Sequence, residues 1–286
     1  MQEHNFGGPW TEIKLEILKK YLDFYTKALR NKPFDLLYID AFAGTGRRTT
    51  TIPSAPILNQ DEKKLTLDGS ARIALNIEHP FDRYLFIETN TARIIELEKI
   101  MSEFPNIYIK IENSDANNVL TELSNKPIWD CNKFRGVIFI DPYGMEVSWD
   151  TLKAIVTTES FDVWYLFPIS GVCRQASRNH SKMEEYKKEA LDKLFGTREW
   201  ESAFYKKITR QGLFETTETI ERSLTIKQIE KWVSDRLKTI FPHVLPPVAL
   251  PSKGSQLYSL YFCISNPDPK AIGLATKAAK FIIKAY

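Results

Sequence analysis

The stretch DLLYIDAFAGTGRR, residues 35–48, joins an apolar run to a turn that contains two glycines one residue apart. The run LLYI leads into Asp40, and Gly44 and Gly46 follow. Glycines at such a turn either permit a tight backbone conformation or let the main chain approach a ligand closely, because they carry no Cβ. A single G-x-G pattern does not distinguish these explanations. The distinction depends on what stands at the ends of the other strands.

Alternating strand-like and helical patterns predict an α/β fold. Four more apolar runs follow the first, RYLFIE (83–88), NIYIKIE (106–112), GVIFID (136–141) and FDVWYLFP (161–168). Helical patterns such as TARIIELEKIMSEF and WDTLKAIVTT lie between them. A first helix is expected from about Thr11, its cap, to Leu29. This order indicates a Rossmann-like, mostly parallel sheet covered by helices on both faces.

The region 171–240 changes character. It carries long charged helical segments, SKMEEYKKEALDKLF and TIKQIEKWVSDRL, and no obvious strand. We expect a helical insertion there, a candidate substrate lid, in a core domain formed by residues 1–170 and 241–286. Two late strand-like runs, PPVALP and QLYSLYFCISN, predict an antiparallel edge of the sheet before a final helix.

Composition excludes several classes of protein. The 286 residues are 43% hydrophobic and 26% charged, as in ordinary globular proteins. No apolar stretch approaches the length of a membrane span, and the amino terminus lacks a signal-peptide pattern, so we expect a cytoplasmic protein. Cys131, Cys173 and Cys263 are far apart and share no metal-type spacing with the four histidines, which predicts neither a disulfide framework nor a metal site. The net charge of +3 does not by itself indicate nucleic acid.

Acidic residues stand at the predicted carboxyl ends of the strands, where open parallel sheets bind ligands. Glu88 could accept both hydroxyls of a ribose, and Asp115 could accept from an adenine amino group. Asp115 could equally cap the helical segment ANNVLTEL that follows it.

The spacing of these residues favours S-adenosylmethionine over a dinucleotide. A dinucleotide fingerprint places the acid about 20 residues after the glycines, whereas Glu88 follows Gly46 by 42 residues. Either the segment 49–70 is an insertion or the fingerprint is false. No third spaced glycine is present to accommodate a pyrophosphate. S-adenosylmethionine has an adenosine and an amino-acid end but no phosphate.

Asp141, Pro142 and Tyr143 follow the buried run GVIFI. An amino nitrogen whose lone pair is delocalised into a base ring is a poor nucleophile. A carboxylate and a backbone carbonyl that accept its hydrogen bonds would favour the nucleophilic geometry and stabilise developing positive charge. Tyr143 could stack on the base. The alternative is a plain turn, for which DPYG has suitable residues.

At these residues the chain resembles class I methyltransferases, and more closely the three-Cys-motif partner protein (TcmP) family, which is predicted to use S-adenosylmethionine. The matching pieces extend over about residues 7–178 and include GGPWTEIKLEILKKYL, YIDAFAGTGR, DGSARIAL, FIE, IDPYGMEVSWDTL and WYLFP. Their order is also similar to that in the bacterial large-subunit rRNA adenine-N6 methyltransferase J family. The resemblance and the strand ends together predict these cofactor-binding residues: Lys14, Asp40, Phe42, Ala43, Gly44, Gly46, Ser70, Glu88, Asp115 and Ala116. The predicted catalytic residues are Asp141, Pro142 and Tyr143.

Departures from the second family leave the target base open. Its D-x-H-A-G histidine is Phe42 here, and the histidine after its amino-terminal lysine is Leu15. Its DPPY is replaced by DPYG, a pattern that also occurs in tRNA guanine-N2 methyltransferases. The first family's name further implies a partner protein with a three-cysteine motif.

A nucleic-acid substrate, RNA in preference to DNA, is suggested by the charges of the insertion. Residues 174–210 contain ten lysines and arginines against six acids, and cations contact phosphates while aromatic rings stack on bases. The aromatic candidates are Tyr186, Trp200, Phe204 and Tyr205. The alternative is a solvated helical face with pairs such as Glu184–Lys188 and Glu189–Lys193.

Single residues near this region carry separate expectations. Arg174, just past a strand end, is expected at the cleft. His180 is expected on the surface without a partner, and Trp164 and Tyr165 in the core.

Other classes of function remain as alternatives. The fold could serve as an S-adenosylmethionine-binding scaffold for a three-cysteine-motif protein, or methylate DNA. A dinucleotide-dependent oxidoreductase is disfavoured by the glycine pattern.

Overall fold

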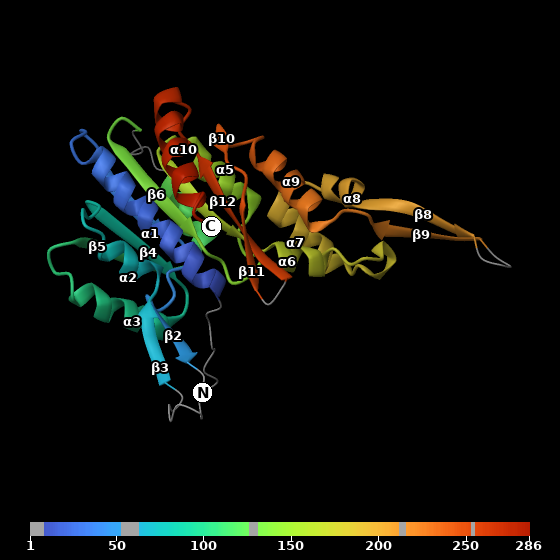
Figure 1. Cartoon of the computed structure of the whole chain (residues 1–286), viewed down its shortest axis with the longest axis horizontal. Helices are drawn as coiled ribbons and strands as arrows, with labels where there is room; N and C mark the ends of the chain where they lie inside the picture. Colours follow the sequence, from blue (N-terminus) through green and yellow to red (C-terminus); the bar gives the residue numbers. More distant parts are fainter. Residues whose placement is uncertain (1–8, 53–62, 126–130, 212–215, 253–254) are drawn as a thin grey trace.

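The computed structural model describes residues 9–52, 63–125, 131–211, 216–252 and 255–286. Within these residues a central sheet has the strand order β10-β12-β7-β6-β1-β4-β5, and β11 pairs with β12 (Figure 1). The strands β1 (Asp35–Asp40), β4 (Arg83–Glu88), β5 (Tyr108–Asn113), β6 (Phe134–Ile140) and β7 (Phe161–Phe167) are parallel. The strands β10 (His243–Val244), β11 (Val248–Ser252) and β12 (Ser255–Ile264) form the antiparallel edge. This arrangement confirms the expected Rossmann-like α/β fold, with a mostly parallel sheet and an antiparallel edge.

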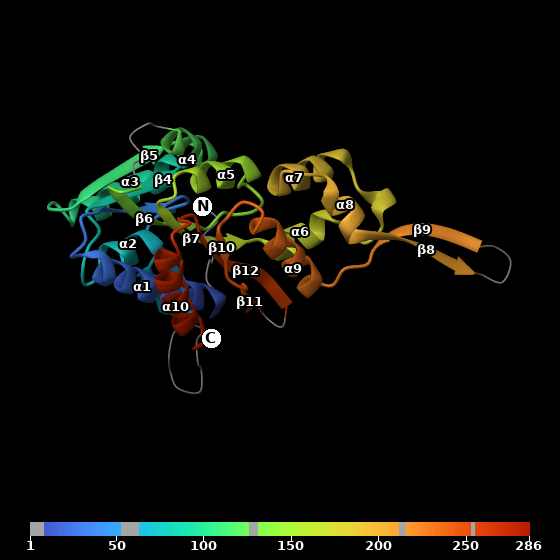
Figure 2. The ribbon, with the colours of Figure 1, turned by 90° about the horizontal axis from the view of Figure 1, so that it is seen from above.

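Helices cover both faces of the sheet (Figure 2). The first face packs against α1 (Pro9–Leu29), α2 (Ser70–Leu75), α3 (Thr91–Ser102) and α10 (Pro269–Ile283), and the second against α4 (Ala116–Ser124) and α5 (Trp149–Thr157). Alternation along β1 explains the two layers, because Leu36 and Tyr38 pack into one core cluster and Leu37 and Ile39 into the other. The expectation for the first cap is wrong, since α1 begins before Thr11.

The insertion contains helices α6 (Ile169–Gln175), α7 (Glu185–Phe195), α8 (Glu199–Phe204) and α9 (Ile226–Leu237), and a short 3₁₀ turn, η2 (His180–Lys182). It also contains an antiparallel hairpin of β8 (Tyr205–Gln211) and β9 (Thr216–Arg222), which projects from the body as an arm (Figure 1). The expectation of a purely helical insertion is therefore wrong over this hairpin. The threonines and isoleucines of the hairpin favour strands. Most of its described side chains are polar and exposed, so the sequence shows no alternation of apolar and polar residues that would indicate strands.

A second hairpin explains the long gap between the glycines and Glu88. Strands β2 (Arg47–Ile52) and β3 (Lys63–Asp68) pair antiparallel, and residues 53–62 lie outside the described part of the chain. The N–H of Gly69 donates to the carbonyl oxygen of Gly46 at 2.8 Å. The hairpin therefore returns the chain to the glycine turn, as an insertion at this point would.

The three cysteines are free thiols. Among the described residues no group of three or more His, Cys, Asp or Glu side chains is arranged to hold a metal ion. In the same part of the chain, no helix has both the length and the apolar character that crossing a membrane requires.

Gly136 provides a test of the sheet packing. A Cβ at this position would lie 2.3 Å from the carbonyl oxygen of Leu37 and 2.7 Å from the ring of Phe161. We expect Gly136→Ala to lower the free energy of unfolding by about 1–3 kcal/mol, because the rigid neighbouring strand must shift. Urea and thermal denaturation would measure this change in the free energy of unfolding.

The matched control is Gly273→Ala, on an exposed part of α10 where a Cβ would meet nothing within 4 Å. This variant should raise stability by about 0.5–1 kcal/mol through helix propensity. Equal stabilities for the two variants would contradict the packing argument.

Candidate active site

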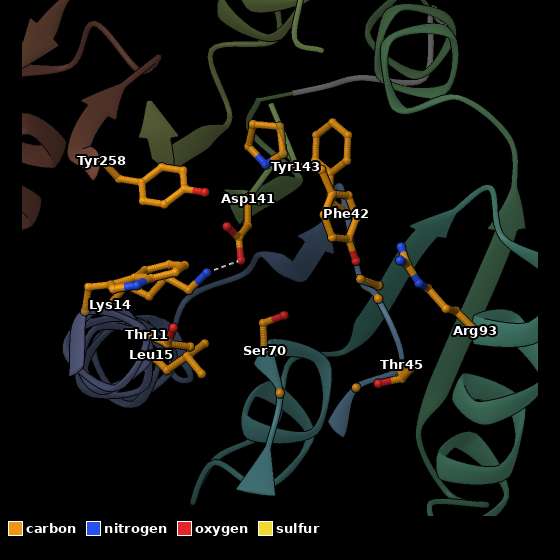
Figure 3. Close-up of a pocket in the computed structure, with 16 residues that line it drawn as sticks. Thr11, Lys14, Leu15, Phe42, Thr45, Ser70, Arg93, Asp141, Tyr143 and Tyr258 are labelled. Atoms are coloured by element: carbon orange, nitrogen blue, oxygen red, sulfur yellow. Dashed lines mark hydrogen bonds and ion pairs between the residues drawn. The ribbon is translucent and has the colours of Figure 1, made fainter. Parts of the chain in front are cut away.

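A cavity of about 330 Å³ lies at the carboxyl ends of β1 and β6 (Figure 3). Its walls come from α1, the glycine turn, the start of α2, the segment after β6, and β12. The structure brings together here most of the residues predicted from the sequence: Lys14, Phe42, Ala43, Gly44, Gly46, Ser70, Asp141, Pro142 and Tyr143. Segments far apart in the chain therefore converge on one cleft, as expected for an open parallel sheet.

A second cavity, of about 240 Å³, adjoins the first at the ends of β4 and β5. Predicted residues Glu88, Asp115 and Ala116 line it. Phe42 and Tyr143 line both cavities, as does Arg93 of α3. The two cavities are thus the halves of one cleft, divided by these shared side chains.

The glycine turn has a structural and a ligand-facing part. Gly44 and Gly46 both have positive φ, +62° and +64°, a conformation that favours glycine. A Cβ on Gly46 would lie 2.6 Å from Ile100 Cδ1, whereas one on Gly44 would have Tyr143 Oη, at 3.7 Å, as its nearest neighbour. Gly46 is therefore required by both the turn and the packing, while Gly44 is required by the turn and faces the cavity.

The carboxylate of Glu88 is held by the main chain. Its Oε1 accepts hydrogen bonds from the N–H groups of Thr89 and Asn90, each at 2.9 Å, and its Oε2 accepts from the N–H of Gly44 at 3.1 Å. The guanidinium of Arg93 lies 3.5 Å from Oε2. With its side chain 4% exposed, Glu88 is a fixed negative group between the glycine turn and the second cavity.

Lys14 of α1 forms an ion pair with Asp141, which directly follows β6 (Figure 3). Lys14 is 5% exposed, and its Nζ also lies 4.9 Å from the ring centre of Trp10. Removing one partner of a pair buried in this way leaves the other charge uncompensated. Helix α1 therefore fixes the direction of the Asp141 carboxylate at the edge of the cavity.

Tyr143 lies across the cleft. Its ring is 4.5 Å from the guanidinium carbon of Arg93, a cation–π contact. Burial raises the pKa of the Tyr143 phenol, which keeps it neutral at physiological pH. The stack places a flat aromatic surface between the two cavities.

Asp40 lies away from both cavities, whereas Asp115 lies where both of the roles predicted for it remain open. Asp40 is fully buried and lines neither cavity, so the structure gives it no place in direct ligand contact. Burial raises its pKa to about 7. The Oδ1 of Asp115 accepts from the N–H groups of Asn117 and Asn118 and so caps α4, the alternative interpretation, although Asp115 also lines the second cavity.

Trp10, Thr11, Arg93 and Tyr258 are among the residues at the cleft that were not predicted as site residues. Trp10 and Thr11 precede Lys14 on the same helix, and Arg93 follows Glu88 by five positions. Trp10 is four residues before Lys14, and this spacing places both on one face of the helix, so it could have indicated that Trp10 lies at the site. Tyr258 of β12 lies 4.8 Å from Trp10, centroid to centroid; no local pattern marked it, because only the antiparallel edge brings it to the cleft.

The aromatic residues of the insertion are mostly core. Trp200, Phe204 and Tyr205 are buried, which rules out their expected role as exposed faces for bases, whereas Tyr186 is 59% exposed. Trp164 and Tyr165 are buried, as predicted.

Two expectations about charged groups of the insertion need correction. The expectation that His180 lacks a partner is wrong, since its Nε2 lies 3.5 Å from Glu201 Oε1 and its ring packs against Tyr205. Lys188 lies near Glu185 and Glu201, at 3.8 and 3.7 Å, in place of the expected i,i+4 pair with Glu184.

Comparison with known proteins gives only distant likeness. No family model matches the chain, and no curated protein matches its sequence. Protein LPL1258 from Legionella pneumophila, of family DUF519, is 15% identical with a TM-score of 0.45, over 94% of this chain and 92% of that one. An S-adenosylmethionine-dependent methyltransferase from Clostridium acetobutylicum is 13% identical with a TM-score of 0.35, over 86% and 91% of the two chains. An rRNA methylase from Streptococcus thermophilus is 8% identical with a TM-score of 0.31, over 71% and 93%.

The buried Asp40 predicts a pH dependence of stability. Its pKa is about 7 in the folded state and about 3.9 in an unfolded chain. Between these values the folded state binds the proton and the unfolded state does not, so the Asp40 contribution to stability falls as pH rises from about 4 to 7.

Asp40→Asn removes this titration. The free energy of unfolding of the variant relative to wild type should increase by about 2–4 kcal/mol between pH 4 and 7. Urea denaturation at several pH values measures this difference, in which other titrating groups such as Asp162 cancel. A difference that does not change with pH would contradict the assignment.

Proposed function

We propose that this protein is an S-adenosylmethionine-dependent methyltransferase that methylates an exocyclic amino nitrogen of a base in nucleic acid, RNA in preference to DNA. One observation carries the proposal. A carboxylate, a proline and an aromatic ring, Asp141 to Tyr143, border the same divided cleft as the Gly44 turn and Glu88. The cleft thus combines groups suited to an adenosine with groups suited to a base.

The residues present suit the cofactor. Glu88 is oriented by three main-chain donors at the boundary between the two halves and is positioned to accept ribose hydroxyls. Asp115 and Ala116 line the half that would hold the adenine. Thr11 lines the other half, and its buried Oγ1 has no hydrogen-bond partner among the described residues. We assign that half, with Gly44 and Ser70, to the amino-acid end of the cofactor.

Asp141 would accept the hydrogen bond of the target amine. S-adenosylmethionine, when bound, would supply an electrophilic methyl group to the base nitrogen in place of its bond to sulfur, and the nitrogen would release a proton to water. Holding the sulfur, the methyl carbon and the base nitrogen in line would provide much of the rate enhancement of methyl transfer. Lys14 is a positioning residue in this scheme, because its ammonium fixes the Asp141 carboxylate. This role differs from the direct cofactor contact that the sequence predicted for Lys14.

Aromatic side chains would hold the base. Tyr143 is 48% exposed beside Asp141 and can offer a ring face to a flipped or single-stranded base. Trp10 and Tyr258 form a second aromatic wall on the other side of the Lys14–Asp141 pair. A neutral planar ligand between such walls is favoured by stacking.

Exposed cations of the insertion would contact phosphates. Arg174, Arg178 and Lys206 are exposed, and the first is close enough to Tyr258 to influence its phenol electrostatically. The insertion would thereby guide a nucleic acid toward the cleft. The three-cysteine-motif partner rests on the family resemblance alone.

The first test separates binding from chemistry at two carboxylates. Glu88→Gln should weaken binding of S-adenosylmethionine, measured by calorimetry, because it removes a charged acceptor of the ribose hydroxyls. Asp141→Asn should lower methyl transfer by a factor on the order of 10²–10³, the scale for losing one preorganised electrostatic contact, with a smaller decrease in cofactor affinity. Mass spectrometry of modified nucleosides with and without the active protein identifies the substrate.

Two controls accompany this test. Asp141→Asn leaves Lys14 without its counter-charge, so its melting transition is compared with that of the double variant Lys14→Met/Asp141→Asn. Wild-type rates in Asp141→Asn would exclude the catalytic assignment. Binding of NAD without binding of S-adenosylmethionine or S-adenosylhomocysteine would overturn the proposal itself.

The second test concerns the nucleic-acid substrate. The triple variant Arg174→Ala/Arg178→Ala/Lys206→Ala should bind single-stranded RNA more weakly, with a salt slope reduced by about 0.7 for each phosphate that is no longer neutralised. Fluorescence anisotropy at several salt concentrations measures the slope. Cofactor affinity should stay at the wild-type value.

The matched control removes three exposed, ion-paired lysines elsewhere, Lys99, Lys153 and Lys231. It removes the same net charge and should keep the wild-type salt slope. Equal salt slopes for the two triple variants would show that the cations of the insertion are solvated surface charges that do not contact phosphates.

A further inference from the structure

A separate cavity of about 360 Å³ lies at the amino ends of the strands, on the opposite side of the sheet from the cleft at their carboxyl ends. It is bordered by α1, α10 and the amino ends of β6 and β7, whereas the cleft is at the carboxyl ends of the strands. Its volume is at the lower end of the range for small-molecule sites. Most of its lining is apolar or aromatic, with Phe24, Leu29 and Leu274 among the contributors.

A carboxylate stands in this apolar wall. Asp162, the second residue of β7, is 7% exposed. Its Oδ2 accepts a hydrogen bond from the phenol of Tyr21 at 2.6 Å, and no residue in the described part of the chain donates to Oδ1. The hydrogen bond from Tyr21 joins β7 to α1, and the proposed methyl transfer does not use the Asp162 carboxylate. A buried carboxylate with an open acceptor oxygen is costly unless a donor or a cation meets it.

Among the charged groups around Asp162, the positive charge of Arg135 lowers the pKa that burial raises, but no described residue donates a hydrogen bond to Oδ1. The Arg135 guanidinium donates through Nη1 to the carbonyl oxygens of Cys131 and Phe134 and stacks on Phe34 at 4.8 Å. Asp268 caps α10 by accepting from the main-chain N–H groups of Lys270 and Ala271. The remaining charges of the lining are the ammonium groups of Lys32 and Lys270, both on exposed residues.

We propose that this cavity is a second ligand site, which binds a small amphipathic amine. The ammonium group pairs with the carboxylate of Asp162, and the apolar body packs against Phe24 and Leu274. A cation fits better than an anion, because the group with an unfilled hydrogen-bond position is an acceptor, while Nη1 of the Arg135 guanidinium is bonded to main-chain carbonyl oxygens. The apolar lining selects for a hydrocarbon or aromatic body over a polyamine.

The test uses three probes with the same indole body. They are tryptamine, which is a cation, tryptophol, which is neutral, and indole-3-propionate, which is an anion. Calorimetry should show that affinity decreases in the order tryptamine, tryptophol, indole-3-propionate. Asp162→Asn, which keeps the shape but removes the charge, should weaken tryptamine binding at least about tenfold, in line with the value of hydrogen bonds to charged groups, and leave tryptophol binding nearly unchanged.

The affinity for tryptamine should depend on pH in a defined direction. Burial raises the pKa of Asp162 to about 7, and the amine of tryptamine stays protonated at pH values well above 7. Affinity for tryptamine should therefore increase from pH 6 to pH 8, as Asp162 ionises, while affinity for tryptophol should not.

Two further measurements locate the site. Ala271→Phe places a larger side chain into the lining from α10 and should abolish binding of tryptamine and tryptophol; it also serves if Asp162→Asn fails to fold. Saturating S-adenosylhomocysteine should not displace tryptamine, because the cleft is at the other edge of the sheet. Displacement by S-adenosylhomocysteine, equal binding of indole-3-propionate, unchanged binding in both variants, or no tryptamine binding would each overturn the proposal.

Discussion

The ion pair between Lys14 and Asp141 joins the first helix to the end of a central strand, across 127 positions of sequence. An ammonium and a carboxylate that are largely removed from water depend on each other, because either alone would carry an uncompensated charge. The pair therefore requires α1 to lie against the carboxyl edge of the sheet. Trp10 and Thr11, on the same helix, thereby come to line the cleft. The apolar residues of α1 hold it against the sheet, and the ion pair fixes how its amino-terminal part meets one wall of the cleft.

The sequence was sufficient for the core architecture and for much of the cleft. Apolar runs such as those ending at Glu88 and Asp141 have the continuous hydrophobic character of parallel strands buried on both faces, so their place in the sheet follows from composition. Because parallel strands end at a common edge, the residues after them could be grouped without knowing the side-chain packing. Ser70 was predicted from the family resemblance alone, and the structure shows that a hairpin returns the chain to the glycine turn just before it.

What the sequence missed depends on contacts between distant segments. Tyr258 enters the cleft because an antiparallel strand joins the sheet beside β7, and no local pattern encodes that neighbour. Asp40 has the residue type and position of a ligand contact, yet it turns into the interior, where Tyr38 lies 3.4 Å from its Oδ2. The projecting hairpin was missed because strand periodicity is visible only when one face is buried.

The arm formed by β8 and β9 has a consequence for local unfolding. A two-stranded ribbon with little core of its own is marginally stable, so its order depends on its base, where the N–H of Arg222 donates to the carbonyl oxygen of Arg178 at 2.8 Å. Main-chain amides beyond this anchor should exchange with solvent through openings that leave the central sheet intact. Apart from the bridge between Glu221 and Asn179, no described strand pairs with the outer edges of the ribbon, so another chain could add a strand there. Charged side chains such as Lys207 and Glu218, an ion pair at 2.6 Å, disfavour that addition and protect the arm from aggregation.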